Sequence, residues 1–355
     1  MKSSSKSQYV QLESDEGVFT DIIERLGAKN IQVSTLEVVE EEYLSKFDKV
    51  YGAIMLFPYS EKHVSRAKEL FQMDPSSIPG LTFVPQVQDN SCGMMAILHV
   101  LLNINDSTIV GPRISSYKDF FEGVTADLRG DSIANATDLV EINNDYEMHH
   151  PVILSDGTTS KEANHYCAFV PYMKVLYQLD GMLSGPVVLE SFDTEAQYRQ
   201  VLISTLKERI QEIVTDDPTT MNVAVMIVHE SFISQYKRHL DMEKKEITDL
   251  KKQLETCKSP VIEAEVTMHE KRMNEILSDI EQENENIKNR KIDHELMRMN
   301  SIPFLNGLLK EYIYESMKKG EYKPIDFSPL LYQKITEMDS TMDDGSIDMD
   351  DKDID

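Results

Sequence analysis

The feature that most constrains this chain is the segment QVQDNSCGMMAILHVLLN, which runs from Gln86 to Asn103. Its first half is polar, and its second half, from Cys92 onward, is an apolar run of helical length without proline. The pattern predicts a turn that leads into a buried helix beginning at Cys92. The positive end of the helix dipole would favour the thiolate, which is the nucleophilic form of cysteine. The alternative is an inert core thiol.

Two predicted strands supply the partners that a nucleophilic cysteine needs. The first, residues 164–172, carries His165 near its start, and the second, residues 174–180, ends at Asp180. A tight connection between them predicts a hairpin, which would bring the histidine and the aspartate to the same edge. Each residue alone fits an ordinary core, surface or turn position. Taken with Cys92, they form the set of nucleophile, general base and orienting carboxylate that thiol catalysis requires.

These motifs resemble the ubiquitin C-terminal hydrolases, which are papain-like cysteine proteases that cleave after the last glycine of ubiquitin. The resemblance rests on a Gln-x5-Cys-Gly motif, an Asn-His strand start and a Leu-Tyr-x-Leu-Asp-Gly strand end. It implies Cys92 as the nucleophile and His165 as the general base and acid. It further implies Asp180 as the carboxylate that orients the imidazole and Gln86 as the oxyanion stabiliser, with no metal and no organic cofactor.

The order of predicted helices and strands favours an α+β fold. Residues 11–27 predict a complete helix that Ser14 or Asp15 caps and Gly27 ends, and residues 50–57 and 221–228 predict buried strands. The resemblance implies an antiparallel sheet flanked by helices, in the papain-like, knotted ubiquitin hydrolase fold, followed by an all-α extension. It also implies that residues 143–163, which have no regular pattern, form a crossover loop that limits substrate size.

Composition excludes several classes of partner. The net charge of -26 argues against nucleic acid, since phosphates would be repelled, and it suits a basic partner such as the arginine-containing tail of ubiquitin. No apolar run is long enough to span a membrane, and the polar first residues predict no secretory signal. The three widely spaced cysteines predict neither a disulfide framework nor a metal site. These features favour a cytoplasmic and nuclear protein.

The pattern changes after residue 229. From Ile233 to Cys257 apolar residues recur at spacings that alternate between three and four, which predicts a heptad seam on one helix. Pro260 breaks this seam, and a second helical pattern follows it, which predicts two helices joined by a turn. Such a hairpin either packs on itself or offers its apolar seam to another protein. A short amphipathic helix follows from Pro303. This arrangement resembles the extension of the long, proteasome-associated ubiquitin hydrolases, in which it binds a proteasomal ubiquitin-receptor subunit.

The sequence therefore predicts three parts: a catalytic domain at 8–229, a helical extension for partner binding at 230–335, and an acidic disordered tail at 336–355. The leading hypothesis is a deubiquitinating thiol protease that acts on ubiquitin and ubiquitinated proteins at the proteasome, through a receptor subunit held by residues 230–335. Two alternatives stay open: a ubiquitin-binding adaptor with little activity, and a protease for a ubiquitin-like modifier.

Overall fold

The structure is a computed structural model, which describes residues 9–59, 65, 69–146, 164–216, 223–298 and 302–319. The chain divides into two units, Met1–Met299 and Asn300–Asp355. The second unit contains helix α11 (Ile302–Lys318), and the first contains every other described element. The three-part domain division stays a prediction, and the predicted crossover loop lies almost wholly outside the described residues.

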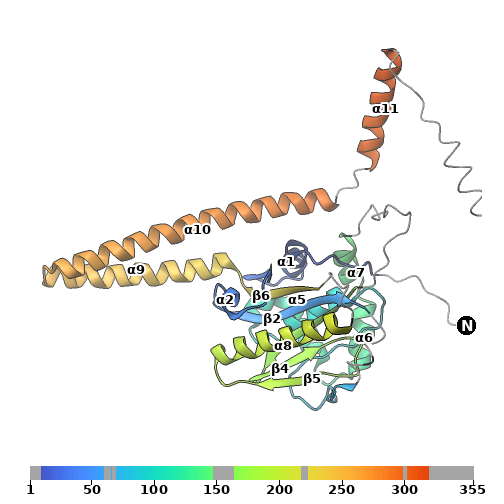
Figure 1. Ribbon diagram of the computed structural model, residues 1–355, viewed down its shortest axis with the longest axis horizontal. Coiled ribbons are helices and arrows are strands. Elements are labelled where there is room, and N and C mark those ends of the chain that lie inside the picture. Colours follow the sequence, from blue (N-terminus) through green and yellow to red (C-terminus); the bar gives the residue numbers. More distant parts are fainter. Residues whose placement is uncertain are drawn as a thin grey trace, which may run out of the picture. The chain divides into compact units, whose positions relative to one another are not determined.

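A six-stranded sheet forms the centre of the first unit (Figure 1). The strand order is β1-β6-β2-β3-β4-β5, and every neighbouring pair is antiparallel. The strands are β1 (Ile31–Thr35), β2 (Val50–Pro58), β3 (Asn164–Tyr172), β4 (Val175–Leu179), β5 (Val187–Ser191) and β6 (Ala224–Glu230). The predicted strand at residues 50–57 is thus confirmed as a central one, and its nearly continuous burial explains its apolar run.

Helices cover both faces of this sheet. One face packs against α1, α4, α5, α6 and α7, and the other packs against α2 and α8. The helices are α1 (Glu16–Arg25), α2 (Glu41–Leu44), α4 (Cys92–Leu102), α5 (Ser107–Phe121), α6 (Ala126–Ala134), α7 (Thr137–Asn144) and α8 (Glu195–Asp216), followed by α9 (Phe232–Thr256) and α10 (Pro260–Arg298). This arrangement confirms the predicted α+β class, with an antiparallel sheet flanked by helices and a helical extension.

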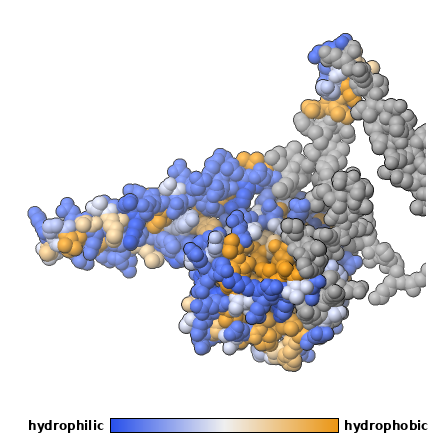
Figure 2. Space-filling view, viewed as in Figure 1, coloured by the Kyte–Doolittle hydropathy of each residue, from blue (hydrophilic) through white to orange (hydrophobic). Residues whose placement is uncertain are grey.

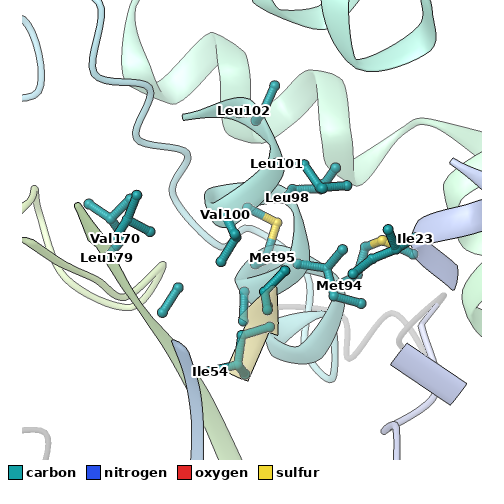
Figure 3. Packing of buried hydrophobic residues seen from close by; sticks show 14 of the residues in the cluster. Ile23, Ile54, Met94, Met95, Leu98, Val100, Leu101, Leu102, Val170 and Leu179 are labelled. Atoms are coloured by element: carbon teal, nitrogen blue, oxygen red, sulfur yellow. The ribbon is translucent and has the colours of Figure 1, made fainter. Parts of the chain in front are cut away.

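Helix α4 is the core helix of the first unit, because all of its residues are buried (Figure 3). A helix that is apolar around its whole circumference needs such a site, and Figure 3 shows Met94, Met95 and Leu98 among the residues that fill it. Among the described residues no single helix is long and apolar enough to span a membrane. Helices α4 and α5, which meet at 119°, satisfy that test of length and composition only as a pair.

Helix α1 begins and ends as its sequence predicts. The Asp15 carboxylate accepts a hydrogen bond from the backbone N–H of Val18 at 2.8 Å, which caps the first turn. Beyond the helix, Gly27 adopts a φ of 97°, a conformation that glycine accepts at little cost. The side-chain cap at Asp15 and the positive φ of Gly27 therefore define the two ends of the helix.

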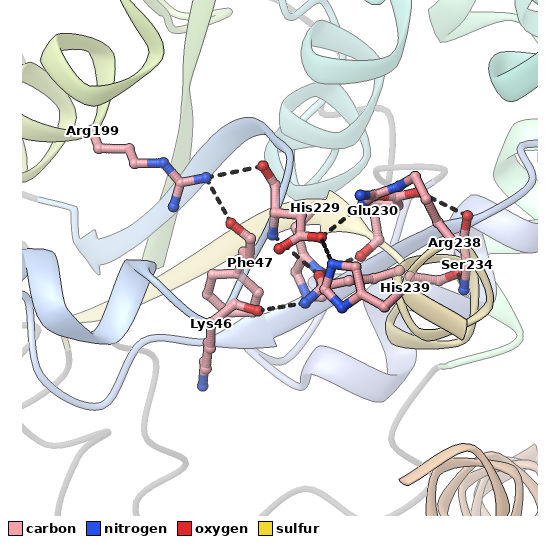
Figure 4. A network of polar contacts seen from close by, with 11 residues as sticks. Lys46, Phe47, Arg199, His229, Glu230, Ser234, Arg238 and His239 are labelled. Atoms are coloured by element: carbon pink, nitrogen blue, oxygen red, sulfur yellow. Dashed lines mark hydrogen bonds and ion pairs between the residues drawn. The ribbon is translucent and has the colours of Figure 1, made fainter. Parts of the chain in front are cut away.

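A polar network joins the extension to the sheet where β6 runs into α9 (Figure 4). The Arg238 guanidinium donates to Asp48 at 2.8 Å and to Glu230 at 2.7 Å. The buried Gln235 amide donates to the Lys46 backbone oxygen at 2.9 Å. Because α9 contributes both side chains, its first turns are held firmly against the loop before β2.

Helices α9 and α10 pack on each other, which confirms the predicted hairpin. Leu240 and Ile247 of α9 and Val266 of α10 are buried, and Lys251 pairs with Glu270 across the hairpin at 2.8 Å. The predicted seam is wrong at its last position, because α9 ends at Thr256 and exposes the next residue, a cysteine. Figure 2 shows a mainly hydrophilic surface along the hairpin.

Helix α10 also contacts the rest of the first unit through buried polar side chains. The Gln32 amide of β1 donates to the Glu283 carboxylate at 3.1 Å, and Arg290 donates to the same oxygen at 3.1 Å. Near the end of α10, the buried His294 ring lies against Tyr146, with ring centroids 5.9 Å apart. The extension is therefore packed along the α1 side of the first unit.

Candidate active site

The predicted turn and helix form the first half of the site. Cys92 is the first residue of α4, as predicted. The turn before it is closed by two hydrogen bonds to the Gln88 backbone oxygen, from the Gln86 amide at 3.0 Å and from the Ser91 hydroxyl at 2.7 Å. Asn90 supports the turn with a φ of 63°, a conformation that asparagine tolerates better than most residues. The chain thus enters α4 with Cys92 at the positive end of the helix dipole.

The β3–β4 hairpin forms the second half. Ala168 pairs with Leu179, so the start of β3 and the end of β4 meet at one edge of the sheet. There His165 Nε2 donates to Asp180 Oδ1 at 2.8 Å, and both side chains are about 95 % buried. Asp180 Oδ1 also accepts the backbone N–H of Met182 at 2.9 Å. Two donors therefore fix the carboxylate, and the carboxylate fixes the imidazole.

The two halves meet between Cys92 and the start of β3. The Cys92 sulfur lies 3.9 Å from the backbone oxygen of Asn164, the residue before His165. Cys92 is 5 % exposed, so it shares the dry environment of the imidazole. The structure thus brings three of the predicted residues, Cys92, His165 and Asp180, into one buried cluster.

The His165 imidazole is held in its charged form. Burial lowers the pKa of His165, but the Asp180 carboxylate and the Cys92 sulfur outweigh this effect and raise that pKa to about 10. With Nε2 committed to Asp180, the other ring nitrogen, Nδ1, faces the thiol. The arrangement suits a thiolate–imidazolium pair, which is the reactive state of a cysteine hydrolase.

Gln86 lies beside the same cluster, anchored through its backbone. Its N–H donates to the Gly181 oxygen at 2.7 Å, which ties the turn before α4 to the residue after Asp180. One N–H of its side-chain amide is used by Gln88, which leaves the second N–H for another acceptor. Its amide oxygen is buried without a hydrogen-bond partner. The oxyanion role of Gln86 stays a prediction, and the second side-chain N–H is the donor that this role would use.

Polar side chains on α4 hold the segment before Gln86 in place. His99 accepts the N–H of Val84 at 3.2 Å, and Asn103 exchanges two hydrogen bonds with the backbone of Thr82, at 2.8 and 2.9 Å. Burial lowers the pKa of His99 to about 4, so this ring stays neutral. Spaced four apart on one helical face, the two side chains fix Gln86 relative to the nucleophile on the same helix.

The segment before α1 crosses both halves of the site. The Tyr166 hydroxyl donates to the Leu12 oxygen at 3.0 Å, and the Gln11 amide donates to the Asn164 oxygen at 3.4 Å. Gly93 faces Leu12 so closely that a Cβ there would lie 3.1 Å from the leucine side chain. This segment therefore braces the residues next to both Cys92 and His165.

Two aromatic rings next to His165 were not predicted from the sequence. Phe57 is the β2 partner of His165, with ring centroids 5.5 Å apart, and the Tyr59 ring centroid lies 6.3 Å from the imidazole. The sequence signal for them was only their place at the end of β2, because their contact depends on the β2–β3 register. Among the described residues, no group of three or more His, Cys, Asp or Glu side chains is arranged to hold a metal ion.

Gly181 gives a direct test of how Gln86 is positioned. A Cβ at Gly181 would lie 2.8 Å from Gln86 Cβ and 2.9 Å from its backbone nitrogen. We therefore expect Gly181→Ala to displace Gln86 and lower kcat by about tenfold or more, with little change in KM. Steady-state hydrolysis of a fluorogenic amide of ubiquitin, the substrate that the resemblance implies, measures both. Gly307→Ala is the control, because nothing lies within 4 Å of a Cβ there, and an unchanged kcat in Gly181→Ala would contradict the expectation.

The family model for ubiquitin carboxyl-terminal hydrolase, family 1, matches residues 9–214, which include all four predicted site residues. The chain is 30% identical over 223 residues to ubiquitin carboxyl-terminal hydrolase 2 of Schizosaccharomyces pombe, an alignment that covers 62% of this chain and 72% of the relative. It is 31% identical over 188 residues to isozyme L5 of Dictyostelium discoideum, and that alignment covers 52% of each chain.

Two solved structures share the fold. Trichinella spiralis UCH37 bound to ubiquitin vinyl methyl ester superposes with a TM-score of 0.58 at 19% identity, covering 80% of this chain and 99% of that chain. The catalytic domain of the same protein, bound to the same probe, gives a TM-score of 0.53 at 25% identity, covering 65% of this chain and 99% of that chain. The larger coverage of the first shows that the fold likeness extends beyond the catalytic domain.

Proposed function

Because the chain belongs to family 1 of the ubiquitin carboxyl-terminal hydrolases, a class of cysteine-type deubiquitinases, we propose that Cys92 attacks the carbonyl carbon of ubiquitin's last glycine. The observation that carries this proposal is that the buried His165 imidazole interacts with Cys92 on one side and hydrogen-bonds to Asp180 on the other. It supplies a nucleophile, a proton carrier and an orienting carboxylate in the order that the reaction needs.

The reaction proceeds in two halves. In the first, the thiolate bonds to the carbonyl carbon, His165 Nδ1 gives its proton to the leaving amine, and the C–N bond breaks to leave a thioester. In the second, His165 takes a proton from water, and the water oxygen bonds to the carbonyl carbon of the thioester. The C–S bond then breaks, which releases the C-terminal carboxyl group of ubiquitin and returns Cys92 to the thiolate and His165 to the imidazolium. The free N–H of Gln86 and the backbone N–H of Cys92, in the first turn of α4, stabilise both oxyanions.

Ubiquitin is the modifier that the comparisons favour. Trichinella spiralis UCH37, which shares the fold, is bound to ubiquitin vinyl methyl ester in both solved structures. The net charge of -26 also suits a basic C-terminal tail. These two observations support ubiquitin over a ubiquitin-like modifier.

The test is to treat the purified full chain with ubiquitin vinyl methyl ester and, in parallel, with probes built on ubiquitin-like modifiers. We expect a covalent ubiquitin adduct that forms on the wild type and is absent from Cys92→Ala. An adduct that forms only with the probe of a ubiquitin-like modifier would show that this modifier, and not ubiquitin, is the substrate. No adduct with any probe, combined with tight binding of unmodified ubiquitin, would favour the adaptor alternative.

We further propose that the protein acts at the proteasome, in the cytoplasm and nucleus, and that the extension binds the partner there. Helix α11 exposes Leu308, Leu309 and Tyr312, each at least 58 % accessible, which is typical of a helix that buries its apolar face against a partner. We expect the purified chain to retain a proteasomal ubiquitin-receptor subunit in a binding assay. Leu309→Asp, with Lys310→Asp as the control for added charge, is expected to weaken that binding, and equal retention would contradict it.

A further inference from the structure

Two aromatic rings border the His165 imidazole, and they differ in their exposure. Phe57 is partly buried and stands nearly perpendicular to the imidazole, at 83°. Tyr59 also meets the imidazole edge-on, at 73°, but it is 39 % exposed. Tyr59 therefore combines a contact with the buried imidazole and a surface that another molecule can reach.

The leaving group must lie beside the imidazole, because His165 supplies its proton. His165 Nε2 is occupied by Asp180, so the proton for the leaving amine comes from Nδ1. The leaving nitrogen must approach within hydrogen-bond distance of the imidazole. The rest of the leaving group must then extend from the imidazole toward solvent. Among the described residues, Tyr59 is an exposed aromatic side chain that borders the imidazole.

We infer that Tyr59 forms a subsite for the leaving group and contacts the aliphatic stem of the lysine in an isopeptide bond. The inference rests on the proposed function, in which that lysine amine departs from the carbonyl of ubiquitin's last glycine. A lysine stem is a chain of methylenes that carries its polar atom at one end. An aromatic ring contacts such a stem without requiring a hydrogen-bond partner, whereas the scissile nitrogen remains beside His165.

The test compares two substrates that share ubiquitin but differ in the leaving group. One is ubiquitin joined to the lysine side chain of a fluorescent peptide, and the other is ubiquitin ethyl ester, whose leaving group is too short to lie along Tyr59. We expect Tyr59→Ala to lower kcat/KM for the isopeptide by about threefold to tenfold and to leave the ester nearly unchanged. Tyr59→Phe, which keeps the ring, is expected to retain the wild-type value for both substrates.

Tyr43→Ala is the matched control, because Tyr43 is 43 % exposed and lies on α2, which packs on the opposite face of the sheet from α4. An equal loss on both substrates would overturn the inference and make Tyr59 a residue that positions His165. No loss on either would also overturn it. A third substrate, ubiquitin extended by a linear peptide, tests the lysine assignment, since a loss confined to it would assign the subsite to an α-linked residue.

Failure of the proposed function gives a different result from failure of this inference. If the wild type forms no adduct with ubiquitin vinyl methyl ester and cleaves none of the three substrates, the proposed function is wrong. If the wild type forms the adduct and cleaves all three, and Tyr59→Ala cleaves them at unchanged relative rates, only the leaving-group subsite is wrong.

Discussion

Cys92→Ala is expected to lower turnover of ubiquitin substrates by about 10⁴-fold or more, because it removes the atom that forms the thioester. The same change removes only one buried sulfur atom, so binding of ubiquitin is expected to persist. Hydrolysis of a fluorogenic ubiquitin amide measures the first effect, and titration calorimetry with unmodified ubiquitin measures the second.

Cys167→Ala is the matched control for loss of a buried thiol. Cys167 is 1 % exposed and lies on β3, two residues after His165, but it packs into the cluster on the α8 face of the sheet. Burial raises the pKa of this thiol well above its usual value, which keeps it protonated and unreactive. We expect Cys167→Ala to retain activity with a modest loss of stability. The reverse outcome, an active Cys92→Ala and an inactive Cys167→Ala, would move the nucleophile to β3.

Asp180→Ala is expected to lower kcat/KM by about 10²- to 10⁴-fold, because the imidazole loses the acceptor that orients it. Asp180→Asn keeps an oxygen acceptor for His165 and for the backbone N–H of Met182 but removes the charge. We expect its loss to be smaller than that of the alanine variant. Steady-state kinetics of the two variants on one substrate separates orientation from charge, and equal activity of both with the wild type would contradict the role of Asp180.

The charge has its own signature in the pH profile. With Asp180 present, the pKa of His165 is raised to about 10, so the imidazole stays protonated well above the pH at which histidine ordinarily loses its proton. The decrease of kcat/KM on the alkaline side is therefore expected at high pH. In Asp180→Asn this pKa falls, and the alkaline limb is expected to move to lower pH. An alkaline limb at the same pH in both proteins would show that another group sets it.

The same raised pKa couples protonation of His165 to folding. The folded protein binds this proton more tightly than the unfolded chain, whose histidine titrates near pH 6.5. The resulting stability is fully present below about pH 6.5 and is lost as pH rises toward about 10. Urea unfolding of Cys92→Ala/Asp180→Asn across this range is expected to show a flatter dependence than Cys92→Ala alone.

The fold was predictable where the signals are local. Helix α4 followed from an apolar run with no proline, and α1 followed from a cap at Asp15 and a stop at Gly27. The meeting of His165 and Asp180 followed from the short connection between their strands, because a hairpin fixes its register. The end of α9 at Thr256 was not predicted, because the heptad spacing in the sequence continues to the next residue, which lies outside the helix.

The sequence by itself determined the type of each element and the chemical groups that the protein offers, because periodicity, caps and short turns act over a few residues. Only the tertiary structure decided that Tyr59 borders His165, that Gly181 touches Gln86 and that α4 presents Cys92 to β3. Those contacts join segments far apart in the chain. They depend on strand register and on close packing of the core, which no local pattern encodes.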